Sequence, residues 1–274
     1  MRTRVFFSSA LPFLLAAWLP AQVNAPKIGV ARYSDNSVHA VFGLHEAFVV
    51  SAQAIGSAEA ISFSDAGGLL ANGGHIQLVG PSLTVLAEYE SSESRPLLNI
   101  DGSLTTAIAW LPAQHALLRW NGNSFLTTEV NSALPGRVTC VRVHNPNTAQ
   151  LLLVEAGGVV SEATISLDTG HLIGLGILPG VAAPAFAQHS FTLFHSDRGL
   201  EVKSENGAVR TLPISATDLM FERMSSDWVH LSSAATKQNW VLHLNERTLE
   251  VSELPALPSP SLASFNATQQ EVQK

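Results

Sequence analysis

Three of the ten histidines in this chain stand near expected turns between strands. They are His75, His115 and His195, and Asp197 and Arg198 follow the last of them. Imidazole, carboxylate and guanidinium groups together can bind a polar ligand, a metal ion or a protein partner. A metal site needs three or four ligands within about 2 to 2.5 Å of one ion. What these residues do therefore depends on the elements that position them.

Motifs for covalent or phosphate chemistry are absent from the sequence. It has no Gly-x-Ser-x-Gly, no His-Glu-x-x-His, no Gly-x-x-x-x-Gly-Lys and no Asp-x-Asp-x-Asp loop. We expect no catalytic residue, no bound metal and no cofactor, and leave enzymatic activity open. A hydrolase or lyase resembling lactonases or glycosidases would need acids that converge at one point. The candidate acids are Glu90, Glu93, Glu155, Glu162 and Asp197.

The first 21 residues have the order of a secretory signal peptide. Arg2 and Arg4 precede the uncharged, largely apolar run "VFFSSALPFLLAAWLP", and Ala21 follows it. Pro12 and Pro20 interrupt the run, which is too short for a comfortable membrane span. We expect cleavage after Ala21, a mature chain without a membrane span, and a periplasmic or secreted location.

The composition predicts a packed fold. Hydrophobic residues make up 46% of the chain and charged residues only 14%, against roughly 25% in ordinary soluble domains. The net charge of −7 disfavours nucleic acid as a partner, because that binding depends on neutralising phosphates. The single cysteine, Cys140, lies in the strand-like run "RVTCVRV" and is expected in the core.

One hairpin pattern recurs along the chain. "HALLRWNGNSFLTTEV" has two strand-like runs around Asn121-Gly122, the residues of a tight turn. The spacing between successive turns runs from 37 to 47 residues. The six hairpins span residues 28–44, 75–90, 115–130, 162–178, 199–214 and 239–254.

Two more strand-like runs precede each of the last five hairpins, such as "AISFSD" and "GLLANGG" before the second. About four short strands in every 40 to 45 residues is the pattern of a β-propeller blade. We therefore predict an all-β propeller of six blades, the first irregular, with seven as the alternative. Trp110 and Trp120 in one unit match Trp228 and Trp240 in another. We expect these tryptophans between blades, the alternative being exposed rings that stack on sugars.

The segment "AISFSDAGGLLANGGHIQLVGPSLTVLAEYE" resembles a blade of the bacterial WD-repeat or YVTN-like propeller proteins. The likeness covers most of residues 28–254 and implies architecture only, since the Gly-His and Trp-Asp pairs of WD repeats do not recur at blade spacing. The expected domains are a signal peptide (1–21), a propeller (22–254) and a Pro-rich linker with a polar tail (255–274).

Turns between second and third strands gather on one face of a propeller, together with the connectors between blades. This face is the expected site for a ligand or partner. Its candidate residues are His75, Glu93, Arg95, His115, Arg137, His195, Asp197 and Arg198.

The favoured function is an exported binding or scaffold module for a protein or small ligand of the cell envelope. The chain would act as a monomer or as part of an assembly. A third hypothesis, beside the hydrolase or lyase, is a structural piece of an envelope assembly joined through the Pro-rich tail.

Overall fold

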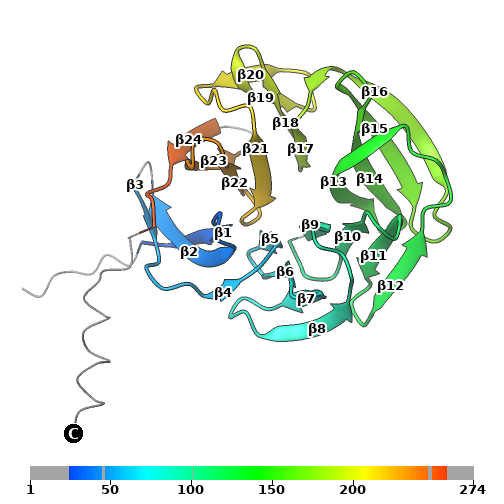
Figure 1. Ribbon diagram of the computed structural model, residues 1–274, viewed down its shortest axis with the longest axis horizontal. Helices are drawn as coiled ribbons and strands as arrows, with labels where there is room; N and C mark the ends of the chain where they lie inside the picture. Colours follow the sequence, from blue (N-terminus) through cyan, green and yellow to red (C-terminus); the bar gives the residue numbers. More distant parts are fainter. Residues whose placement is uncertain (1–24, 45–46, 101, 246–248, 258–274) are drawn as a thin grey trace, which may run out of the picture.

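The computed structural model describes residues 25–257 except 45–46, 101 and 246–248. All regular secondary structure in these residues is β-strand. The 24 strands form six antiparallel sheets of four strands. Figure 1 shows the sheets arranged radially around one axis. The chain is thus an all-β propeller of six blades, as the repeats predict.

Each blade is built from strands that follow one another in the chain. Blade one holds β1 (Lys27–Arg32), β2 (Ser37–Leu44), β3 (Ala47–Val50) and β4 (Gly56–Ser57); blade two holds β5 (Ala60–Ser64), β6 (Gly67–Asn72), β7 (His75–Val79) and β8 (Val85–Glu90); blade three holds β9 (Leu97–Ile100), β10 (Ala107–Leu111), β11 (Ala116–Trp120) and β12 (Phe125–Glu129). Blade four holds β13 (Gly136–Asn145), β14 (Thr148–Glu155), β15 (Val159–Ser166) and β16 (Leu172–Ala182); blade five holds β17 (Ala185–Gln188), β18 (Phe191–Ser196), β19 (Gly199–Ser204) and β20 (Val209–Leu212); blade six holds β21 (Leu219–Arg223), β22 (Trp228–Ser233), β23 (Asn239–Leu244) and β24 (Leu249–Glu253).

The expected hairpins are present, but the first is not equivalent to the other five. Those five pair the third and fourth strands of blades two to six. The first hairpin pairs β1 with β2. The outer part of blade one is also broken, because β3 and β4 both pair with β2. Blade one is therefore the irregular blade that the sequence predicts.

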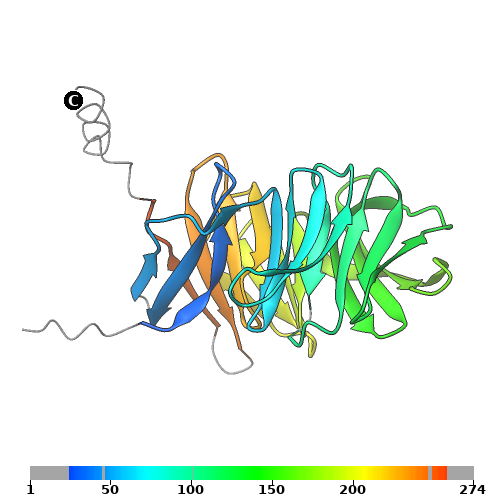
Figure 2. The ribbon, with the colours of Figure 1, turned by 90° about the horizontal axis from the view of Figure 1, so that it is seen from below.

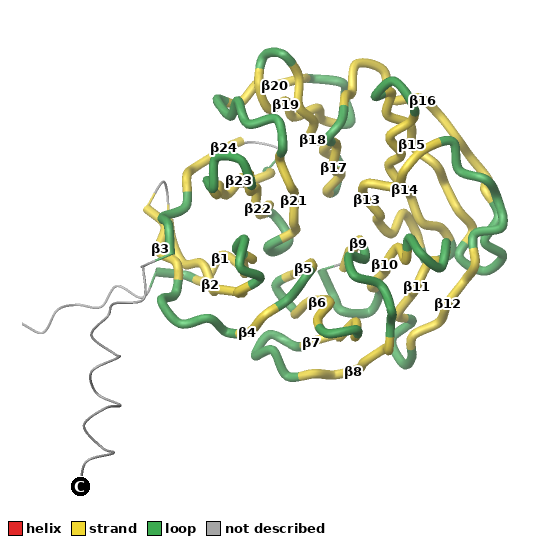
Figure 3. The backbone as a smooth tube through the Cα atoms, in the orientation of Figure 1, coloured by secondary structure: helices red, strands yellow, loops and turns green. Residues whose placement is uncertain are grey.

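The direction of β1 explains this difference. The Val30 N–H donates to the Met224 carbonyl at 3.4 Å, while Arg32 Nε lies 2.7 Å from Glu222 Oε1. As β1 advances from Val30 to Arg32, its neighbours run backwards from Met224, just after β21, to Glu222 within it. β1 is therefore antiparallel to β21, the innermost strand of blade six. It thus runs like a second strand, and its turn to β2 rises at the upper side of the ring in Figure 2. In the described residues of blade one, no strand corresponds to the innermost strand of the other blades, and β1 lies further from the axis than β5 and β21 (Figure 3).

The core lies between the blades. Five residues of β14, from Ala149 to Leu153, are buried in succession, as expected for a strand covered on both faces. Trp110 is 3% exposed and belongs to a cluster that joins blades three and four. The half-buried Trp120 packs between blades two and three, and the half-buried Trp228 packs between blades six and one. Half-buried Trp240 packs against the cluster that spans blades four to six. The tryptophans thus pack between blades, as predicted.

Candidate binding surfaces

The connector between blades two and three, which includes Ser91 and Glu93, forms hydrogen bonds with turns on the expected face. The Ser91 N–H donates to the Gly74 carbonyl in the β6–β7 turn at 2.7 Å. Glu93 is buried, and its Oε1 accepts the N–H groups of Ala113 and Gln114 at 2.8 and 3.0 Å. One connector therefore fixes the second turns of two adjacent blades. Glu93 therefore supports the backbone of the neighbouring turn through its Oε1.

The three histidines of this face lie in different surroundings. His75 Nδ1 is 2.9 Å from Glu88 Oε1 on the outer strand β8. His115 Nδ1 lies 2.9 Å from the Val130 carbonyl oxygen, and its ring meets Trp110 edge to face at 5.1 Å. His195 is half-buried near the end of β18. His75 and His115 therefore hold local contacts within their own blades.

The four remaining candidates are exposed and come from three places in the ring. Arg95 lies in the connector fixed by Ser91 and Glu93, and Arg137 lies at the start of β13. Asp197 and Arg198 form the β18–β19 turn, where Arg198 Nη2 is 2.6 Å from the buried Glu201 Oε1. The structure thus places the eight candidates at one end of the blades, but it does not join them into one cluster.

The carboxylates considered for catalysis occupy separate places. Glu90 ends the outer strand β8, Glu155 ends β14, and Glu162 lies within β15. Glu93 caps a turn and Asp197 lies in blade five, as described above. Among the residues that the structure describes, no group of three His, Cys, Asp or Glu side chains could hold a metal ion.

At the opposite end of the blades, two side chains make contacts between blades through the β21–β22 region. Arg223 is buried at the end of β21, and its Nη1 donates to the carbonyl of Ile100, the last residue of β9. Blades three and six stand opposite one another in Figure 1, so this contact crosses the axis. Gln188 Nε2 donates to the Ser226 carbonyl at 2.7 Å. These contacts tie the β21–β22 turn to blades three and five.

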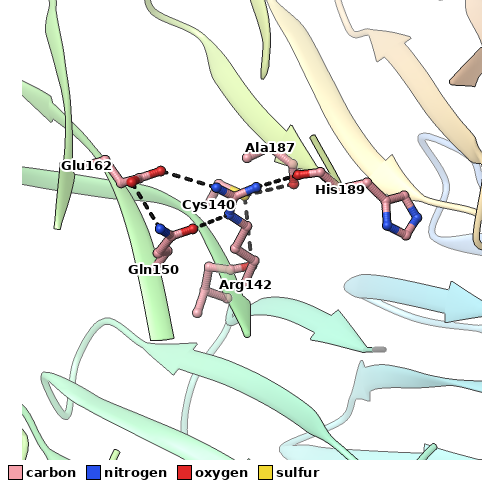
Figure 4. Close-up of polar contacts among 7 residues, drawn as sticks. Cys140, Arg142, Gln150, Glu162, Ala187 and His189 are labelled. Carbon is pink, nitrogen blue, oxygen red and sulfur yellow. Dashed lines mark hydrogen bonds and ion pairs between the residues drawn. The ribbon is translucent and has the colours of Figure 1, made fainter. Parts of the chain in front are cut away.

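A polar network faces blade five from blade four, as Figure 4 shows. Arg142 donates to Gln150 Oε1 at 2.6 Å and to the His189 carbonyl at 2.6 Å, and it lies 3.3 Å from Glu162. Cys140 is buried next to this network, where its thiol contacts the Ala187 carbonyl at 3.7 Å. Cys140 is thus a core side chain, as predicted, and its burial raises the pKa of the thiol to about 11.

A groove between blades five and six was not anticipated from the sequence. Its volume is about 590 Å³, within the range of ligand pockets. It opens at the end of the blades that carries the β17–β18 and β19–β20 turns, opposite the expected face. The lining residues are Ser190, Phe191, Val202, Ser204, Glu205, Asn206, Ala208, Arg210, Asn245 and Leu249. These residues come from separate strands and turns of two blades, so no sequence pattern groups them together.

Two further expectations concern the ends of the chain. The signal peptide lies outside the described residues, as do residues 258–274 of the tail. The chain still packs beyond Leu254, because Tyr33 donates its O–H to the Pro255 carbonyl at 3.3 Å and Leu257 joins the cluster of blades one and six. No helix of the described part is long and apolar enough to cross a membrane.

Comparisons with known proteins identify the architecture. No protein-family model matches the chain, and no curated protein matches its sequence. A chain in the nidogen/laminin complex superposes with a TM-score of 0.53 at 10% identity, over 82% of this chain and 92% of that one. This likeness shows the propeller fold alone.

Two other solved structures match with lower scores. Hydrazine synthase of Kuenenia stuttgartiensis has a TM-score of 0.44 at 11% identity, over 84% of this chain and 80% of that one. The Pan2 WD40 domain of Neurospora crassa has a TM-score of 0.43 at 10% identity, over 86% and 80%.

Proposed function

We propose that the chain is an exported propeller that works as a binding module for a small ligand or a peptide segment of a partner. The observation that carries this proposal is the groove of about 590 Å³ between blades five and six. Propeller blades are rigid, so a groove between two of them is formed before a ligand arrives. A formed site avoids much of the entropy cost of ordering loops on binding.

The groove combines charge with apolar surface. Arg210 and Glu205 supply opposite charges, and Asn206 supplies an amide. Phe191 and Leu249, both half-buried, supply apolar surface. A guanidinium group is suited to carboxylate recognition because it offers paired donors. The matching ligand is a segment with an acidic group near Arg210 and an apolar side chain against Phe191.

The proposed export rests on the order of residues 1–21, which lie outside the described structure. A single buried cysteine agrees with a fold stabilised by packing alone, because no disulfide can form within the chain. We place the mature protein in the periplasm or outside the cell, where the partner would belong to the envelope.

A second binding surface is the expected face with Arg95 and Arg137. Both side chains are exposed there, and Glu93 holds the connector that carries Arg95. A partner protein could contact this face while a smaller ligand occupies the groove, because the two surfaces lie at opposite ends of the blades.

The test separates the two surfaces. Tagged residues 22–274 are incubated with envelope and secreted fractions of the source organism, crosslinked briefly, and captured for mass spectrometry. Arg210→Glu reverses the charge in the groove. Arg95→Glu/Arg137→Glu reverses it on the expected face and serves as the matched control. Circular dichroism confirms that each variant is folded.

The expected result is a partner that Arg210→Glu loses and the control retains. A partner lost only by Arg95→Glu/Arg137→Glu would move the site to the other face and overturn the groove assignment. Capture of no specific partner by the wild-type protein would contradict a binding function for the chain in this setting.

A further inference from the structure

The outer strand of blade four has an exposed apolar row. β16 is 11 residues long and lies at the end of its sheet, paired on one side with β15. Figure 1 shows it along the outer rim of the ring. Ile173, Leu175 and Ile177 are 59, 52 and 67% exposed. Leu175 and Ile177 share one face because alternate residues of a strand do so, and Ile173 stands at a bulge next to them. We call these three exposed side chains the apolar row.

An exposed edge strand invites pairing with another strand, and proteins commonly protect such edges with charged residues. Four of the five outer strands described for blades two to six carry charges: β8 has Glu88 and Glu90, β12 has Glu129, β20 has Arg210, and β24 has Glu250 and Glu253. β16 has none. Its edge therefore lacks the charge protection that the other blades have.

The sequence of this strand is self-complementary. Residues 172–178 read Leu-Ile-Gly-Leu-Gly-Ile-Leu, which is the same in both directions about Leu175. In an antiparallel pair of two such strands related by a two-fold axis at Leu175, Ile173 faces Ile177 and Gly174 faces Gly176. Aliphatic pairs across neighbouring strands are stabilising. No like charges face one another, because the strand is uncharged.

The structure also limits the length of this pairing. A β-bulge lies at Ile173, because Thr164 pairs with Gly174 while Ile165 pairs with Leu172. A second irregularity follows Ile177, where Ser161 pairs with Ile177 but Val159 pairs with Ala182, and Pro179 in this stretch lacks an N–H. The regular part of the strand is therefore Gly174 to Ile177, and Ile173 stands at its bulged end.

We propose that two copies of this chain associate edge to edge through β16, with the two-fold axis at Leu175. The partner is a second copy because the row matches itself residue by residue. The two sheets of blade four then form one continuous sheet of eight strands, with the apolar rows adjacent. This interface is isologous and closed. It is independent of the groove between blades five and six.

A cysteine at the axis tests the register. In the proposed pair the two Leu175 residues face each other with Cα atoms about 4.5 to 5.5 Å apart, within disulfide range. Leu175→Cys is therefore expected to form a disulfide-linked dimer under mild oxidation, seen on a non-reducing gel. Val209→Cys is the matched control on the outer strand β20, where Val209 is 44% exposed. Equal crosslinking of both variants, or of neither, would contradict the proposal.

Paired charge variants give a second test that needs no covalent bond. In Ile173→Lys/Ile177→Glu each lysine faces the glutamate of the other copy, whereas Ile173→Lys/Ile177→Lys sets lysines opposite lysines. Sedimentation velocity on residues 22–274 is expected to show a concentration-dependent wild-type dimer. The lysine–lysine variant should dissociate at least tenfold more readily than the lysine–glutamate variant. A wild-type monomer at all concentrations, or equal dissociation of the two variants, would overturn the two-fold pairing.

Discussion

At the residue scale, two buried charged side chains form hydrogen bonds with backbone groups of other blades. Glu93 is as buried as a core residue, and its carboxylate accepts two backbone N–H groups of blade three. Arg223 likewise donates to a backbone carbonyl on the opposite side of the ring. A buried charge needs such partners because its desolvation is costly. Residue type alone therefore indicates little about which charges meet a ligand.

Removal of the Glu93 carboxylate should destabilise the fold. Glu93→Ala leaves the N–H groups of Ala113 and Gln114 without their acceptor, which should cost about 1 to 3 kcal/mol of unfolding free energy. Glu93→Gln should cost less, because an amide oxygen can still accept. Urea denaturation followed by tryptophan fluorescence measures both. Glu90→Ala, at the exposed end of β8, is the control. Equal stability of Glu93→Ala and wild type would contradict this role.

Asp218 should make stability depend on acid. Its carboxylate accepts the Ser233 hydroxyl at 2.5 Å and the Ala235 N–H at 2.8 Å. The Ser233 hydrogen bond, followed by that of Ala235, lowers its pKa below the ordinary value of 3.8. A depressed folded pKa stabilises the fold above the unfolded pKa and loses this effect as pH falls through the folded pKa.

The variant Asp218→Asn removes this titration. We expect the variant to unfold at a lower urea concentration than wild type. The difference between the two urea midpoints should be larger at about pH 6 than at about pH 2.5. Asp197→Asn in the exposed β18–β19 turn is the matched control for removing a surface carboxylate. A difference that grows on acidification would refute the assigned direction.

At the element scale, the blades are held by packing across their faces. Trp110 lies among the buried residues of blades three and four, whereas Trp120 is half-buried at the other face of blade three. Trp110→Ala should therefore cost about 3 to 5 kcal/mol of unfolding free energy, as large-to-small changes in cores do. Trp120→Ala should cost less. Thermal and urea denaturation measure both, and the reverse order would contradict the assignment of Trp110 to the core.

At the scale of the whole molecule, blades one and six meet directly, and the strands described at the two ends of the chain stay in separate sheets. Blade six consists of consecutive strands, and blade one meets it through Arg32–Glu222 and Val30–Met224. A third contact comes from residues after the last strand, where the Pro255 carbonyl accepts the Tyr33 hydroxyl. Burial raises the pKa of this phenol from 10.0 to about 12, so it keeps its proton for this bond further into the alkaline range than an exposed tyrosine does.

This closure predicts a difference between two truncations. A chain of residues 22–254 lacks the Pro255 carbonyl and the Leu257 side chain, whereas a chain of residues 22–257 retains both. The shorter chain should therefore melt at a lower temperature, by a few degrees, since about 1 to 2 kcal/mol is lost. Differential scanning calorimetry measures both chains. Identical melting would show that residues 255–257 do not support closure.

The sequence by itself determined the all-β fold and the grouping of strands by four, whereas the structure decided for six blades over seven. These features are local: turn residues near Gly122 and apolar runs such as β14 depend on backbone conformation and on burial of both faces. The burial of Cys140 and the tryptophans between blades followed from the same patterns. The face that carries His75 and Arg95 followed from strand alternation.

Only the tertiary structure decided how distant segments meet. The reversed direction of β1 depends on its contacts with β21, about 190 residues later in the chain. Glu93 and Arg223 form hydrogen bonds with backbone groups of other blades. The groove is lined by residues of blades five and six. These contacts have no periodic pattern, because each forms where two blades happen to pack. A sequence read residue by residue therefore indicates the blades, while the binding surfaces come from their arrangement around the axis.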